Sequence, residues 1–146
     1  FQAEIMRRQT KLLESEKKPM LLFKHETRNN QITLTFISIS KYPILIEDIK
    51  FELSNNLPRG IQVDNQITIR FPREYNYAPT LTSLNNLIGK ALIEGSSVSI
   101  RFSTTDSALT PFGIVKLKAS NQYHREISIE YEYNLESGEL KIKENS

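Results

Sequence analysis

The pattern that most constrains the fold begins after Pro19, where short runs of alternating apolar and polar residues continue to the end of the chain. A period of two is typical of β-strands that bury one face and expose the other. SVSIRF, GIVKLKA and EISIEYEY are the clearest runs. Their apolar positions are Val98, Ile100, Phe102, Val115, Leu117, Ala119, Ile127, Ile129, Tyr131 and Tyr133. The pattern predicts a mainly β protein.

Eight or nine such runs, separated by turn signals, favour an antiparallel two-sheet sandwich that is immunoglobulin-like in the loose sense. An open β-barrel is the alternative. The chain has neither Cys nor Trp, so it lacks the Cys…Trp…Cys mark of true immunoglobulin domains. Its 146 residues suit one domain with a sizeable core.

Four local signals make finer predictions. The apolar positions change parity at Phe36–Ile37 and again near Glu47–Asp48, which predicts two irregularities such as β-bulges. Asp64-Asn65 predicts a tight turn. Gly138 predicts the turn of a C-terminal hairpin. Leu81, Leu84, Ile88 and Ala91 have helical spacing, which predicts a short helix over 81–92.

Residues 1–18 differ from the rest because their apolar side chains follow a helical period. Phe1, Ile5, Met6, Leu12 and Leu13 form a heptad-like seam, which predicts an amphipathic association helix or spacer. Pro19 ends it, and residues 19–146 form the β-domain. A helix of this length is marginal alone, so its cover is its own sheet, a second copy of the chain or an upstream continuation.

The first 23 residues resemble the juncture in a broad group of poorly characterised bacterial membrane-tethered proteins. In that group a transmembrane segment is followed by a Gln/Met/Leu-rich helix, a proline and the first strand of a β-rich domain. The matching features are Gln2, Met6, Arg7, Arg8, Gln9, Leu12, Leu13, Glu14, Pro19 and the apolar run 20–23. The resemblance implies membrane tethering and self-association, and it supplies no catalytic or binding residue.

Residues that could carry catalysis are sparse. The chain has two histidines, His25 and His124, with no second ligand at metal-site spacing, and it has no cysteine. Glu130 and Glu132 alternate with apolar residues, so they belong to the solvent face of a strand. No GxSxG elbow and no Gly-rich phosphate loop occurs. We expect no enzymatic activity, no metal site and no cofactor.

One loop has the residue types of a binding site. Arg73, Tyr75 and Tyr77 lie between Pro72 and Pro79, which restrain the loop and lower the entropy lost on binding. Arg and Tyr are enriched at binding hot spots. The formal net charge of +2 is too small to favour a nucleic-acid partner.

The function predicted from the sequence is therefore a non-enzymatic accessory or protein-interaction module, the soluble part of a longer membrane-tethered protein. Its first residue is Phe1 rather than Met, which we read as the loss of an upstream segment that would hold it at a membrane. A homo-oligomer through the N-terminal helix and an unknown protein partner go with this prediction. The alternative is a ligand-binding domain for peptide or carbohydrate, or a weakly enzymatic one, that uses the 72–80 loop. The alternative location is cytoplasmic.

Overall fold

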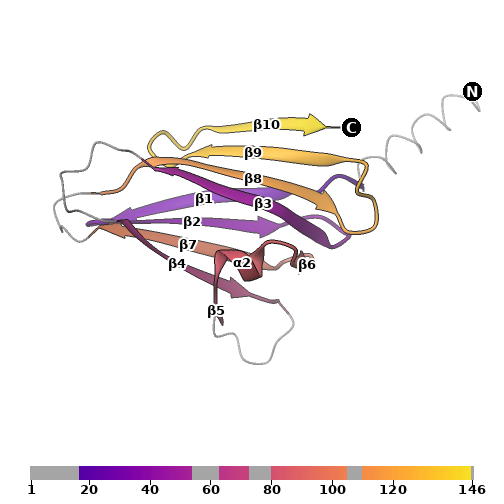
Figure 1. Cartoon of the computed structure of the whole chain (residues 1–146), viewed down its shortest axis with the longest axis horizontal. Helices are drawn as coiled ribbons and strands as arrows, with labels where there is room; N and C mark the ends of the chain where they lie inside the picture. Colours follow the sequence, from indigo (N-terminus) through magenta and orange to yellow (C-terminus); the bar gives the residue numbers. More distant parts are fainter. Residues whose placement is uncertain (1–16, 54–62, 73–79, 105–109, 146) are drawn as a thin grey trace, which may run out of the picture.

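The computed structural model describes residues 17–53, 63–72, 80–104 and 110–145. These residues form ten strands and one short helix (Figure 1). The elements are β1 (Leu21–Arg28), β2 (Gln31–Ser38), β3 (Ile44–Leu53), β4 (Val63–Arg70), β5 (Thr80–Thr82), α2 (Leu84–Leu87), β6 (Ala91–Leu92), β7 (Ser97–Thr104), β8 (Gly113–Asn121), β9 (Ser128–Asn134) and β10 (Leu140–Asn145).

The described strands form two five-stranded antiparallel sheets. Sheet A has the order β1-β2-β7-β4-β5, and sheet B has the order β10-β9-β8-β3-β6. No strand pair joins sheet A to sheet B within the described ranges. The prediction of a two-sheet β-sandwich is therefore confirmed, and the open barrel is not the architecture of this part of the chain.

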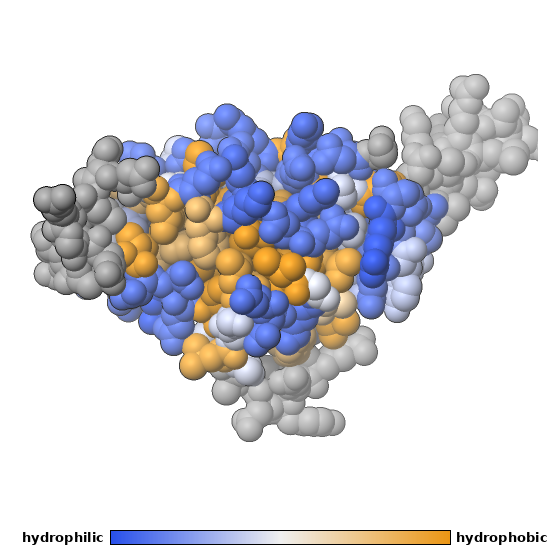
Figure 2. Space-filling view, in the orientation of Figure 1, coloured by the Kyte–Doolittle hydropathy of each residue, from blue (hydrophilic) through white to orange (hydrophobic). Residues whose placement is uncertain are grey.

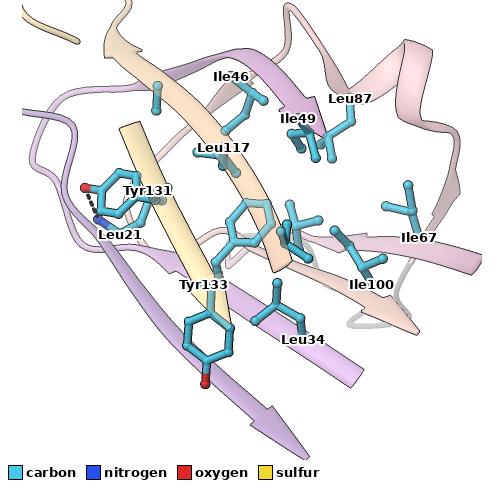
Figure 3. Close-up of a cluster of buried hydrophobic side chains, with 14 of the residues drawn as sticks. Leu21, Leu34, Ile46, Ile49, Ile67, Leu87, Ile100, Leu117, Tyr131 and Tyr133 are labelled. Carbon is cyan, nitrogen blue, oxygen red and sulfur yellow. Dashed lines mark hydrogen bonds between the residues drawn. The ribbon is translucent and has the colours of Figure 1, made fainter. Parts of the chain in front are cut away.

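The core lies between the two sheets and is built from the alternating positions (Figure 3). In β2 the buried apolar residues are Ile32, Leu34 and Phe36, and in β7 they are Val98, Ile100 and Phe102. Across the core, the ring of Phe51 in β3 meets Phe102 edge to face, with centroids 5.0 Å apart. Figure 2 shows an apolar band crossing the open side of the sandwich, where half-buried side chains complete the core.

Two of the local predictions are confirmed. The pairing of β3 with β8 shifts register between Ile46 and Asp48, so Ile49 returns to the core after the irregularity. The hairpin between β9 and β10 turns at Gly138, whose φ of 74° lies in the left-handed region that glycine adopts without strain.

Three local predictions are wrong or too long. β2 pairs without a register shift through Ile37, so Phe36–Ile37 is not a bulge. Asp64 and Asn65 pair with Ser103 and Phe102 of β7, so they extend β4 rather than form a turn. The helix predicted over 81–92 is only α2, because residues on both sides of it pair as β5 and β6.

The chain enters the sandwich through a fixed segment at one end of the molecule, which we call the Pro19 end. The Tyr131 hydroxyl donates to the carbonyl of Pro19 at 2.5 Å and accepts from the N–H of Leu21 at 3.3 Å. The Ser40 hydroxyl accepts from the N–H of Met20 at 2.6 Å and donates to the carbonyl of Lys18 at 3.0 Å. Sheet B and the β2–β3 loop thus hold the backbone that leads into β1.

The predicted association helix and its seam of Phe1, Ile5, Met6, Leu12 and Leu13 lie outside the described residues. Within the described ranges, no helix is both long and apolar enough to cross a bilayer.

Candidate functional site

The binding residues predicted from the sequence, Arg73, Tyr75 and Tyr77, also lie outside the described residues. The candidate surfaces must therefore come from the two outer faces of the sandwich and from its Pro19 end. The two histidines can be placed first, because each is described.

His25 and His124 lie in different parts of the fold, and each is near a tyrosine. The Nδ1 atom of His25, in β1, is 2.5 Å from the hydroxyl of Tyr133 in β9. Burial raises the pKa of Tyr133. His124, between β8 and β9, has its ring edge-on to Tyr42 and its Nδ1 atom 3.8 Å from a carboxylate oxygen of Glu126. Among the described residues, no three acidic or histidine side chains converge as a metal site.

The outer face of sheet B carries long charged side chains in two rows that cross the strands. One row is Asp48, Lys118, Glu130 and Lys143, and the other is Lys50, Lys116, Glu132 and Lys141. A groove of about 450 Å³ lies between these rows. Its walls are flexible side chains on a sheet surface, so it differs from a preformed apolar ligand pocket.

The charges on this face compensate one another. The Lys116 ammonium lies 3.0 Å from Glu52, and the hydrogen bond and charge of Glu52 raise the pKa of Lys116. Lys50 lies 3.7 Å from Asp48, and the Ser120 hydroxyl donates to Glu47 at 3.1 Å. In both rows, lysine and glutamate alternate across β8, β9 and β10. Two of the five lysines in the rows thus lie within 4 Å of a carboxylate, and the other three lie opposite a glutamate in the neighbouring strand.

The outer face of sheet A is built from short side chains instead. Its centre is an array of half-buried hydroxyls on three neighbouring strands, which we call the hydroxyl array. The array consists of Thr33, Thr35, Thr68, Ser97, Ser99 and Ser103. Thr35 and Ser99 face each other across β2 and β7, with their hydroxyl oxygens 3.0 Å apart. A hollow of about 310 Å³ lies beside the array, where β1 meets β2.

Four cations lie around the hydroxyl array. Lys24 and Arg28 project from β1, Arg70 from β4 and Arg101 from β7. The side chains of these four make no hydrogen bond or ion pair with another residue in the described part of the chain. Glu26 and Asp64 lie on the same face, and neither carboxylate is paired with a described cation.

An exposed apolar cluster occupies the corner of this face at the Pro19 end. We call it the apolar corner: Met20, Leu22, Ile37 and Ile39. Leu22 lies directly opposite Ile37, and the N–H of Ile39 donates to the carbonyl of Met20 at 3.1 Å. Leu22 and Ile39 are each about half exposed, at 53% and 51%. The parity change in the sequence at Phe36–Ile37 marked this corner, since Ile37 and Ile39 are apolar residues on the outer face.

Sequence reasoning missed the outer-face cations, although a signal for them was present. Arg101 occupies the polar parity between Ile100 and Phe102, two positions that the alternation predicts to be apolar. Comparison of the chain with protein-family models, curated proteins and solved structures found no match in any of the three.

Proposed function

We propose that this chain is a non-enzymatic protein-interaction module and that the outer face of sheet A is its docking surface. The observation that carries the proposal is the set of four cations around the hydroxyl array, whose side chains make no ion pair with a described residue. We also propose that the sandwich is immunoglobulin-like. The orders β1-β2-β7-β4 and β9-β8-β3 support this, because they match strands A-B-E-D and G-F-C of that fold.

Side-chain entropy favours sheet A over sheet B as the docking face. Immobilising a rotamer-rich side chain at an interface costs about 0.5–1.5 kcal/mol, and lysine and glutamate are among the costliest. The outer face of sheet B carries such residues at nearly every position. Serine and threonine have one rotatable side-chain bond to the hydroxyl, so the hydroxyl array can be covered at a smaller entropic cost.

Charge complementarity indicates the chemistry of the partner. Arg70 and Arg101 present planar guanidinium groups that bind carboxylates through paired hydrogen bonds. On sheet B, an incoming carboxylate would have to displace partners such as Glu52 from Lys116. We therefore propose a protein partner with a flat surface that places carboxylates opposite the arginines of sheet A.

Tethering at a membrane remains part of the proposal. The hydrogen bonds of Tyr131 and Ser40 to residues 18–21 support it, because they give an N-terminal tether a fixed point of attachment. In this arrangement a pull on the N-terminal segment acts on β1, which sheet B holds through Tyr131.

Photo-crosslinking in the cells that produce the protein tests the docking face. A photoreactive residue is placed at Thr35 or Ser99 on sheet A, and matched positions on sheet B are Lys118 and Glu130. We expect a discrete protein adduct from the sheet A positions and none from the sheet B positions. Charge reversal at Arg70 and Arg101 together should remove the adduct while leaving the circular dichroism spectrum unchanged.

Adducts from sheet B, or adducts that survive the double charge reversal, would contradict the proposal. A photoreactive residue at Tyr75 tests the 72–80 loop in the same experiment. A strong adduct there, with none at Thr35, would move the binding site to the loop and leave the outer face of sheet A without a partner.

A further inference from the structure

Exposed apolar side chains gather at the Pro19 end. Eight large apolar residues are exposed in the described part of the chain, and five of them lie at this end: Met20, Leu22, Ile39, Ile93 and Tyr123. Of these, Met20, Leu22 and Ile39 belong to the apolar corner. A contiguous apolar patch on a surface marks a site of contact with another molecule or with lipid.

The apolar corner is already formed, so binding needs no ordering of its backbone. Leu22 and Ile37 lie in paired strands. The Ser40 hydroxyl holds the backbone at Met20, because it accepts from the Met20 N–H and donates to the carbonyls of Lys18 and Met20. Leu22 and Ile37 are directly opposed on the outer face, and the hydrogen bond from Ile39 to Met20 continues this pairing beyond the strand ends.

Lysines lie around the apolar corner. Lys17 and Lys18 precede Met20, Lys24 follows Leu22 on the same face of β1, and Lys41 follows Ile39. Lys18 is paired with Glu144 at 3.2 Å, and the Lys41 ammonium lies 6.0 Å from the ring centre of Tyr42. Three described acidic residues are also near the corner: Glu144, which pairs with Lys18, Glu26, which follows Lys24 on the same face of β1, and Glu94 in the turn before β7. Among the described residues, four lysines and three carboxylates therefore lie around the corner.

We propose that the apolar corner and its lysines rest on an anionic lipid surface, with the four apolar side chains at the boundary between headgroups and acyl chains. Four side chains are far fewer than the 20 to 30 residues that each partner contributes to a typical stable protein interface. Lysine is depleted from the core of protein interfaces, whereas apolar side chains flanked by lysines are typical of peripheral membrane contacts. The small size of the patch and the lysines at its rim thus favour lipid over protein.

Two tyrosines extend the same contact. Tyr42 and Tyr123 lie in the loops at the Pro19 end, and Tyr123 is 68% exposed. Tyrosine is enriched at membrane–water interfaces because its ring is apolar and its hydroxyl is polar. This contact lies at the corner of the outer face of sheet A and shares Lys24 with the cations around the hydroxyl array. Its apolar residues lie outside the array, so it does not depend on protein docking there.

The absence of tryptophan from the chain gives a direct test. Leu22→Trp introduces a single tryptophan into the apolar corner, and Leu81→Trp is the matched control at a residue that is 64% exposed elsewhere. Vesicles of phosphatidylcholine with about 30% phosphatidylserine are added, and pure phosphatidylcholine vesicles serve as the uncharged comparison. We expect a blue shift of the Leu22→Trp emission, and quenching by brominated acyl chains, with the anionic vesicles only. The Leu81→Trp emission should not change.

Variants of the apolar corner and its lysines measure how much each contributes to vesicle binding. The double variant Leu22→Ser with Ile39→Ser should weaken vesicle binding about ten-fold or more, whereas Leu81→Ser with Ile142→Ser removes equal apolar area and should leave it unchanged. Lys17→Gln and Lys41→Gln should each weaken binding about five-fold at low salt. The matched variants Lys118→Gln and Lys143→Gln on sheet B should have no such effect.

Three results would overturn the inference. Vesicle binding without a change at Leu22→Trp would mean that other residues, such as 1–16, make the contact. A blue shift that needs no vesicles and grows with protein concentration would mean that the corner is covered by a second copy of the chain. Equal loss of binding in the corner and control variants would mean that no specific surface is used. None of these results bears on the adducts at Thr35, so the two proposals fail separately.

Discussion

The outer faces of the two sheets are both exposed to water, but they carry different kinds of polar side chain. Sheet B covers its strands with long lysine and acidic side chains that pair, as Lys116 does with Glu52. Sheet A covers its centre with hydroxyls and leaves four cations around them without a described partner. A face whose charged side chains pair with one another gains a little stability and leaves fewer charges free to bind a partner. A face whose charged side chains do not pair is suited to binding.

The comparison assumes that the two sheets form one cooperative unit, and Tyr131 provides the strongest test of that assumption. Its ring belongs to sheet B, and its hydroxyl binds the backbone at the edge of sheet A. Tyr131→Phe should lower the free energy of unfolding by about 2 kcal/mol, because it leaves a buried N–H and a buried carbonyl without that partner. Chemical denaturation should still give one transition. Two transitions would mean that the sheets unfold separately and that their faces cannot be compared as parts of one domain.

The same residue makes stability depend on alkaline pH. Burial, opposed in part by the hydrogen bond from Leu21, raises the pKa of Tyr131 to about 12 from its usual value of 10. The unfolded chain therefore ionises this tyrosine first as the pH rises, so its contribution is complete below pH 10 and is lost between about pH 10 and 12. Tyr131→Phe should flatten this part of the stability profile, and Tyr123→Phe, at an exposed tyrosine, serves as the control.

Charge reversals at matched positions on the two outer faces test the comparison between them, with a smaller expected effect on the free energy of unfolding. Lys118 lies between Asp48 and Glu130 in neighbouring strands, so Lys118→Glu places three carboxylates in one row. We expect a loss of about 1 kcal/mol in the free energy of unfolding, since directly opposed like charges each cost a fraction of that. Arg101 lies between Thr33 and Gln66, so Arg101→Glu should change stability by less than about 0.5 kcal/mol.

Salt provides the control for the charge reversals. The loss in Lys118→Glu should shrink as ionic strength rises, because exposed charges are screened. If Arg101→Glu proved as destabilising as Lys118→Glu, the charges of sheet A would also have structural partners, and the contrast between the faces would be wrong.

The sequence predicted the inner faces of the sheets much better than the outer ones. Alternation placed Ile100 and Leu117 in the core correctly, because burial of one strand face follows from the order of residues alone. Lys118 lies opposite Glu130 because β8 and β9 are neighbours in a particular register. The order of residues within one strand specifies neither the neighbouring strand nor the register. For the same reason the hydroxyl array, drawn from three strands, could not be recognised before the fold was known.

The prediction at Phe36–Ile37 failed for a more instructive reason. A change of apolar parity has two physical explanations, a bulge that rotates the strand or an apolar residue on the solvent face. At Glu47 the first holds, because the register shifts there. At Ile37 the second holds, and the unusual exposure is the apolar corner. The predictions for Arg73, Tyr75 and Tyr77 and for the N-terminal helix remain predictions, since those residues lie outside the described ranges.

The smallest expected effect concerns the hydroxyl array. Thr35 and Ser99 are joined by one hydrogen bond on a half-exposed face, so Thr35→Ala and Ser99→Ala should each cost about 0.5 kcal/mol or less. A double-mutant cycle should give a coupling of about the same size, as is usual for one cross-strand hydroxyl pair. Water can replace the lost partner at an exposed site, which is why the cost stays small. A coupling above about 1.5 kcal/mol would mean that the hydroxyls form a structural network of their own. In that case the outer face of sheet A, like that of sheet B, would be committed to stability, and the reason for assigning the docking surface to it would be lost.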